Sequence, residues 1–249
     1  MVISTGNLVW WTVMVLTGTG TYGLYAMLES CNAQYQRTAL LFCGVVIFGL
    51  FFLQRFFMFR DPDFFEMYGS ELRERFVQWL PLHVCYSGLM LTMVGLYLDY
   101  EPLEAFGFYV GWLGTFMAMF SPDGYYQNKP LFHPPILLLY LTHGLLMALY
   151  GCICFLGLFQ PSWSAGIQSV FLLALLSLGL HGINLMGHKL GLTTMNFGYT
   201  MSPEGSSVLE TLWKWLPCQY LYLQVPGALF FGMWTMIANA LYFLWQRLM

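Results

Sequence analysis

Several histidines lie inside apolar stretches of this 249-residue sequence, where an ionisable side chain is costly and therefore raises a question of function. His83 begins the run HVCYSGLMLTMVGLYL, and His143 lies in the middle of LLLYLTHGLLMALY. His181, Asn184 and His188 follow at a spacing of i, i+3 and i+7, which places them on one helical face. A neutral imidazole can act as a general base near neutral pH. We therefore predict a site at which these groups, from three helices, converge in one half of a membrane.

A base of this kind needs a group to activate, and the sequence offers four hydroxyls or thiols near the first two histidines: Cys85, Ser87, Thr142 and Cys152. Ser87 lies four residues after His83 and shares its helical face, whereas Cys85 and Thr142 point to other faces. Neither a GxSxG nor an HExxH motif is present. The nucleophile is therefore left open by the sequence.

Metal chemistry is disfavoured by the spacing of the possible ligands. The sequence has no CxxC and no HxxxH pair, and its apolar runs carry no carboxylate well inside them. We predict neither a metal nor a cofactor. Asn196, in the loop sequence TTMNFGY, is a further polar candidate, although asparagine also suits a turn.

The composition requires that these groups be positioned by membrane-spanning helices. Hydrophobic residues make up 58% of the chain and charged residues 8%, against about 25% charged in soluble domains. Seven apolar runs are long enough to be spans. We predict one all-α polytopic transmembrane bundle over residues 1–249, with membrane lipid as a partner and, at a net charge of -3, no nucleic-acid surface. The predicted spans are 8–28, 38–58, 80–99, 105–121, 134–158, 165–188 and 217–245.

Lysine and arginine are distributed unevenly between the connections, and this predicts an orientation. If the N-terminus is cytoplasmic, the inner connections hold Arg60, Arg73, Arg75, Lys129, Lys189 and Lys214, and the outer side holds only Arg37 and Arg247. The charged loop RDPDFFEMYGSELRERFVQW alternates charges with apolar residues, which predicts a short amphipathic helix at the membrane surface.

Short motifs give a family resemblance over roughly residues 75–235. LPLHVC at 80–85, SPDG at 121–124, LTHG at 141–144, and the N-x-x-G of 184–187 followed by MNFGY resemble the YwaF-type integral-membrane family. Animal relatives of that family look like lipid acyltransferases that act on lysophospholipids, and more distant relatives are lipid hydrolases with a buried histidine. The resemblance implies catalytic roles for His83, His143 and Asn196. The chain departs from the animal pattern at Leu82, where a cysteine usually precedes the histidine, and its nearest thiol is Cys85.

Two functions remain open. The chain can be a lipid-modifying acyltransferase or hydrolase, with His83 as base or nucleophile, His143 as partner base or acid, and Asn196 as oxyanion donor. Alternatively it is a non-catalytic membrane subunit that packs against other membrane proteins or binds lipid, and its histidines bond neighbouring helices. A transporter is less favoured, because no charged residue lies deep in a span.

Overall fold

Long helices dominate the structure, a computed structural model that describes residues 2–68, 71–122, 124–126, 129–203, 205 and 207–248. Within these described ranges, five helical segments are long and apolar enough to cross a membrane, and α1 and the shorter apolar helix α5 complete the seven predicted segments. The prediction of an all-α transmembrane bundle is confirmed. The segments are α1 (Leu8–Leu28), α2 (Ala33–Met58), α5 (Val84–Leu98), α6–η1–α7 (Glu101–Phe106, Gly107–Gly111 and Trp112–Phe120), α8 (Pro134–Phe155), α9 (Trp163–Lys189) and α11 (Leu221–Leu248).

Polar side chains fix where several of these helices begin. The side chains of Asn7, Asn32 and Ser162 each accept a hydrogen bond from a backbone N–H in the first turn of α1, α2 and α9. Such N-caps satisfy donors that would otherwise be unpaired at a helix start. The third span begins at Val84 rather than at residue 80, so His83 is its N-cap residue and not part of its first turn.

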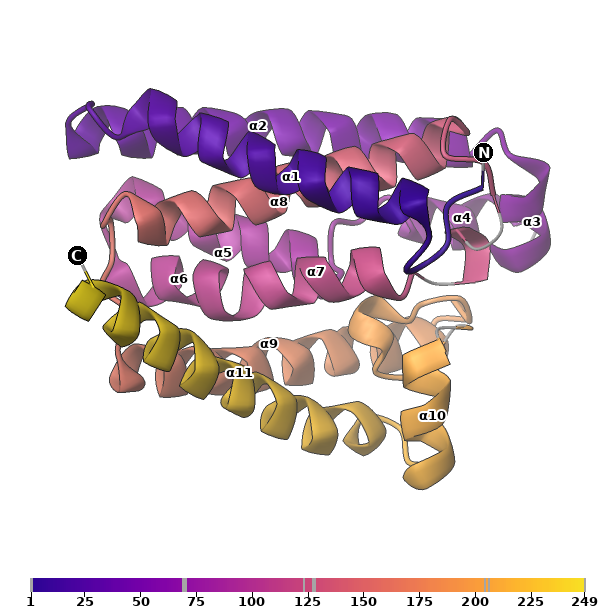
Figure 1. Cartoon of the computed structure of the whole chain (residues 1–249). Coiled ribbons are helices and arrows are strands. Elements are labelled where there is room, and N and C mark those ends of the chain that lie inside the picture. Colours follow the sequence, from indigo (N-terminus) through magenta and orange to yellow (C-terminus); the bar gives the residue numbers. More distant parts are fainter. Residues whose placement is uncertain are drawn as a thin grey trace.

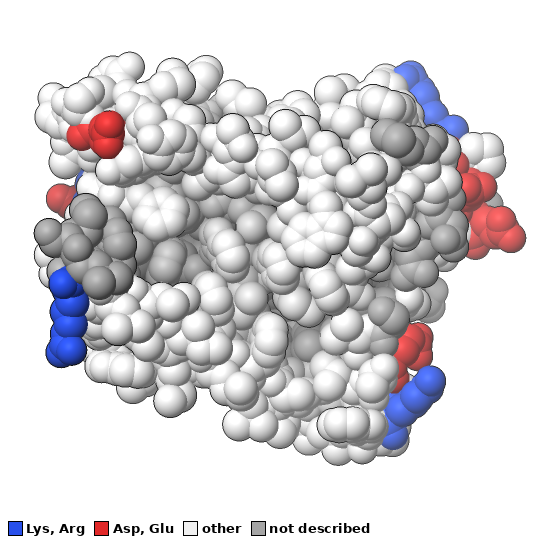
Figure 2. Space-filling model, viewed as in Figure 1, with Lys and Arg blue, Asp and Glu red and all other residues white. Residues whose placement is uncertain are grey.

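The segments pack in three rows that are visible in Figure 1. α8 lies against α1, α2 and α7, and most of its side chains are buried, which makes it the central helix. α5, α6 and α7 form the middle row, and α9 packs with α11 below them. The charged side chains visible in Figure 2 lie at the two ends of the bundle and leave an uncharged belt between them, as expected for a protein that spans a bilayer.

A π-helical turn, η1, interrupts the fourth span at the sequence GFYVG. A Cβ atom added at Gly107 would lie 2.5 Å from Thr92 Oγ1, and one added at Gly111 would lie 2.6 Å from the Tyr150 ring. These glycines therefore allow α5 and α8 to approach η1 closely, which is the packing role of small residues in membrane helices.

The surface segments lie mostly at the end of the bundle that holds the N-terminus (Figure 1). The charged loop after α2 forms two short helices, α3 (Pro62–Tyr68) and α4 (Leu72–Val77), and not the single amphipathic helix predicted. Before α11, the chain forms a loop with a short 3-10 turn, η3 (Phe197–Tyr199), and then the helix α10 (Ser207–Trp215). We call residues 190–203 the α9–α10 loop.

Candidate functional site

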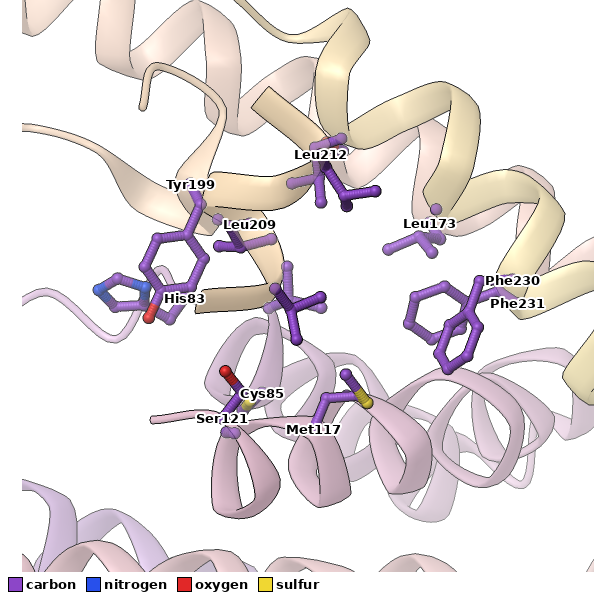
Figure 3. Close-up of a pocket in the computed structure, with 18 of the residues that line it drawn as sticks. His83, Cys85, Met117, Ser121, Leu173, Tyr199, Leu209, Leu212, Phe230 and Phe231 are labelled. Atoms are coloured by element: carbon purple, nitrogen blue, oxygen red, sulfur yellow. The ribbon is translucent and has the colours of Figure 1, made fainter. Parts of the chain in front are cut away.

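A cavity of about 560 Å³ lies between α5 and α7 on one side and α9, α10 and α11 on the other. His83 and His143, which are 60 positions apart in the sequence, both line it. One end is polar and the other is apolar, as Figure 3 shows for His83 and Tyr199 at one end and Phe230 and Phe231 at the other. We call this space the histidine cavity. Its polar lining includes Gln54, Arg55, Gln78, His83 and His143, and its apolar lining includes Leu173, Leu212, Phe230, Phe231 and Met233.

His83 is held in this cavity by aromatic contacts. Its ring centroid lies 5.8 Å from that of Phe197 and 5.6 Å from that of Tyr199, both in the α9–α10 loop. In the part of the chain that the structure describes, neither ring nitrogen of His83 forms a hydrogen bond. Among the described residues, packing against these two rings rather than a hydrogen bond therefore positions the His83 imidazole.

His143 is oriented by its own helix. Its Nδ1 atom lies 2.8 Å from the backbone oxygen of Leu139, and its ring packs edge-on against Tyr86 with centroids 5.8 Å apart. Because a carbonyl oxygen only accepts hydrogen bonds, the neutral imidazole carries its proton on Nδ1. The Nε2 lone pair is then left to act as a base.

Arg55 is a cavity residue whose importance the sequence reasoning missed. It is buried near the end of α2, and its guanidinium lies 5.0 Å from the centroid of the Phe51 ring. The neighbouring Gln54 also lines the cavity and donates hydrogen bonds to the Tyr126 hydroxyl and to the Pro135 carbonyl. The signal was present in the sequence as a polar QR pair inside the apolar run FFLQRFFMF.

Of the four proposed nucleophiles, Cys85 is the one that lines the histidine cavity. Figure 3 shows its side chain at the edge of the cavity. The Thr142 hydroxyl donates to the Leu138 carbonyl at 2.7 Å, and the Cys152 thiol lies 3.7 Å from the Thr21 carbonyl. Ser87 is buried away from the cavity lining. The off-face position predicted for Cys85 does not keep it out of the cavity, because the helix starts after His83 and places residue 85 in its first turn.

The polar face of α9 does not join the two histidines in the cavity; it binds the α9–α10 loop. Asn184 accepts a hydrogen bond from Phe197 N at 2.9 Å and donates one to Phe197 O at 3.0 Å. His181 Nδ1 lies 3.1 Å from Thr200 Oγ1, and His188 Nε2 lies 2.8 Å from Met195 O. The predicted convergence therefore brings α5 and α8 together, whereas α9 uses its polar groups to hold the loop over the end of the bundle.

Asn196 lines a second cavity of about 390 Å³, whose lining does not include His83. Its Oδ1 atom accepts hydrogen bonds from the backbone N–H groups of Met201 and Ser202, and its Nδ2 atom donates to the Ser202 carbonyl and hydroxyl. The structure thus does not place Asn196 in the histidine cavity, and its side chain forms a turn within the loop. We call this second space the loop cavity.

A buried carboxylate fastens the α9–α10 loop to α4. Glu74 accepts hydrogen bonds from the backbone N–H and the hydroxyl of Thr193, at 2.7 and 3.1 Å, and from those of Thr194, at 3.0 and 2.5 Å. Burial raises the pKa of Glu74, but the hydrogen bonds from Thr194 and Thr193 outweigh that effect and hold the pKa below its ordinary value of 4.5. Because the folded state lowers this pKa, the charge stabilises the loop above about pH 4.5, and that stability is lost as the pH falls through the lowered value.

Replacing Glu74 with glutamine is expected to release the loop locally. Hydrogen bonds to a charged group contribute about 1.5–3 kcal/mol each, so the protection of the Thr193 and Thr194 amides from hydrogen exchange should fall about tenfold or more at pH 7. Glu71→Gln, at an exposed position in the residue before α4, is the matched control and should change nothing. Wild-type protection should also fall on acidification below pH 4.5, whereas that of Glu74→Gln should not; an acid response shared by both proteins would contradict the assignment.

Comparison with known proteins places this bundle in a family. The model of the TMEM164 family, a family of multi-span membrane proteins, matches residues 2–235, which is nearly the whole chain and includes both cavities. Neither the comparison with curated proteins nor that with solved structures found a match. The match says nothing about acyl transfer, and it carries the name of a different family from the YwaF-type resemblance. By the extent of the match, the chain belongs to the TMEM164 family.

Proposed function

We propose that this protein is a lipid-modifying enzyme that transfers or hydrolyses an acyl group in the histidine cavity. One observation carries the proposal: His83, His143 and Cys85 line a single cavity whose other end is apolar. An amphiphile such as a membrane lipid matches this division, because its head group and ester suit the polar end and its acyl chain suits the apolar end.

The apolar end also reaches the lipid-facing surface of the bundle, which supports substrate entrance from the bilayer. Leu229 and Met233 of α11 both line the cavity, yet 67% and 61% of their surfaces are exposed. Residues that face a cavity and the outside at once mark its opening. A lipid can therefore reach the histidines by sliding sideways between helices, without its acyl chain crossing water.

The chemistry follows from the three polar side chains. In the first step an imidazole, which we assign to His143, takes the proton of the Cys85 thiol, and the thiolate sulfur attacks the ester carbonyl carbon. A carbon–sulfur bond forms, the ester carbon–oxygen bond breaks, and the lyso-alcohol leaves with the proton. In the second step a hydroxyl of the acceptor, or water in hydrolysis, attacks the thioester and restores the thiol. His83, at the same end, serves the second proton transfer, and Arg55 offers positive charge to the developing oxyanion.

The orientation of the site in the membrane is also part of the proposal. The histidine cavity has its polar end near α3 and α4, on the side to which the bias in lysine and arginine assigns the cytoplasm. The N-terminus is then cytoplasmic, and the substrate is a lipid of the inner leaflet.

Filling the cavity tests this function directly. Gly114 of α7 lines the cavity, and a Cβ atom added there meets no atom within 4 Å, so Gly114→Leu should fold and occupy the space of the acyl chain. Purified protein in nanodiscs, supplied with a lysophospholipid and an acyl donor or with a diacyl lipid alone, is assayed for products by mass spectrometry. We expect turnover that falls by about tenfold or more in Gly114→Leu, a loss of about 1.4 kcal/mol in transition-state binding.

The control for this substitution is Gly182→Leu in α9, which also has no atom within 4 Å of an added Cβ but lies at an exposed position away from the cavity lining. It should leave turnover unchanged. Equal turnover in all three proteins, or none in the wild type with any acyl lipid, would contradict the proposed function.

We also propose, as a second candidate, a non-catalytic subunit that packs against other membrane proteins. The exposed apolar side chains along α9 and α11, such as Ile167, Phe171 and Met236, favour it, because either lipid or protein can cover them. Gentle extraction followed by native mass measurement separates the two candidates. A stable complex with a second membrane chain supports the subunit, and a monomer that turns over lipid supports the enzyme.

A further inference from the structure

The two cavities are separated by a thin wall. Among the residues that the structure describes, Tyr68 is the one whose side chain lines both the histidine cavity and the loop cavity. It is the last residue of α3, it is buried, and its ring packs against Phe64 with centroids 4.7 Å apart. Beside it, Gln78 lines the histidine cavity and donates a hydrogen bond at 3.2 Å to the carbonyl of Thr194, which lines the loop cavity.

The loop cavity opens away from the membrane belt. Its lining includes the exposed residues Met67, Ser202 and Gly205, and it lies between α3 and the α9–α10 loop at the end that holds the N-terminus. The rest of its lining combines methionines with hydroxyl, amide and imidazole groups, and polar atoms make up a larger share of it than of the lining of the histidine cavity. Such a lining suits small hydrophilic molecules.

The histidine cavity and the loop cavity thus open to different surroundings. The histidine cavity reaches the bilayer beside Leu229 and Met233, and the loop cavity reaches water. We propose that the loop cavity is the binding site through which a small hydrophilic reactant, such as water or a small alcohol, reaches the histidines, and that the Tyr68 side chain closes the connection. A turn of the Tyr68 ring would join the two spaces. The identity of the reactant rests on the proposed function, whereas the route itself does not.

Charged side chains near the loop cavity limit the kinds of molecule that suit its entrance. The Glu74 carboxylate is bonded to Thr193 and Thr194, which form part of the cavity wall. Arg73 donates hydrogen bonds to the carbonyls of Leu190 and Gly191 in the same loop, at 3.2 and 3.1 Å, so charges of both signs lie near this entrance and a neutral reactant suits it. A permanently charged probe is suitable for testing the route, because it cannot reach the histidines through lipid.

The native thiol of Cys85 reports on the connection without any need for turnover. Full-length protein in nanodiscs is treated with a trimethylammonium methanethiosulfonate, which cannot cross lipid, and modification of each cysteine is followed by peptide mass spectrometry. Tyr68→Ala should raise the rate of Cys85 modification on the order of tenfold, and Tyr68→Phe, which keeps the ring, should leave it unchanged. Exposed Cys218 should react alike in all three proteins, and buried Cys152 should stay unmodified.

Several outcomes would overturn the proposal. Slow modification of Cys85 in all three proteins means that Tyr68 does not close a route, and fast modification in all three means that nothing is closed. If Cys152 becomes reactive in Tyr68→Ala, that variant is unfolded, and the measurement is repeated with Tyr68→Leu, to which the same two outcomes apply. Labelling of Cys85 does not depend on catalysis. Fast labelling of Cys85 in Tyr68→Ala together with no lipid turnover in the wild type would therefore support the route and contradict the proposed enzymatic function.

Discussion

Replacing His143 or His83 with alanine is expected to reduce acyl turnover by about 10²–10⁴-fold, the usual contribution of general acid–base catalysis. For His143 the reason is the free Nε2 atom, which its Nδ1 contact with Leu139 directs away from the helix backbone. For His83 the reason is an imidazole without a hydrogen bond among the described residues, at the polar end of the same cavity. The nanodisc assay with mass-spectrometric detection of products measures both variants.

The matched control for these variants is another histidine of the bundle. His181 contacts Thr200 in the α9–α10 loop and does not line the histidine cavity. His181→Gln should therefore retain turnover within a small factor of the wild type. Wild-type turnover in both His83→Ala and His143→Ala would remove the enzymatic interpretation and leave the non-catalytic subunit.

The largest expected loss of stability lies at the opposite end of the bundle, where Arg37 of α2 forms an ion pair with Glu104 of α6. The Glu104 side chain is completely buried and that of Arg37 is 12% exposed. Removing one member of a buried pair leaves an uncompensated charge, at a cost of about 3–5 kcal/mol. We expect Arg37→Met and Glu104→Leu each to lower the free energy of unfolding, measured by titration with SDS, by an amount of this order.

Two further variants separate the buried pair from surface electrostatics. The double variant Arg37→Met with Glu104→Leu should lose less stability than the sum of the single variants, because neither charge is then left without its partner. Asp99→Asn removes the other carboxylate bound to Arg37, at 2.5 Å, but 77% of the Asp99 side chain is exposed. That change should cost little. Additive single effects, or a cost at Asp99 equal to that at Glu104, would contradict the assignment.

This ion pair also shows what a local interpretation of the sequence misses. Glu104 precedes a predicted span, where an acid suits a helix N-terminus. In the folded bundle Glu104 instead lies in the interior, where it pairs with Arg37 of α2. The reason is that the fourth span starts at Glu101, so that Glu104 lies within its first turns. The pairing partner is 67 positions away, and no local pattern specifies it.

The sequence by itself determined the class of fold and the positions of the spans. Hydropathy and helix length are local properties, and a bilayer forces each apolar run of about 20 residues to become a helix. The same local reasoning predicted that His83 and His143 converge in one half of the membrane, and the structure brings both to one cavity.

Only the tertiary structure decided which polar residues share that cavity. The polar side chains of α9, which are His181, Asn184 and His188, form hydrogen bonds with the α9–α10 loop. Asn196 lines the loop cavity instead of the histidine cavity. Arg55 and Cys85 enter the histidine cavity because α2 and α5 pack around it. A cavity is the space left by several helices packed together, so its lining depends on helix rotation and on contacts between segments distant in sequence, which periodicity along one helix does not fix.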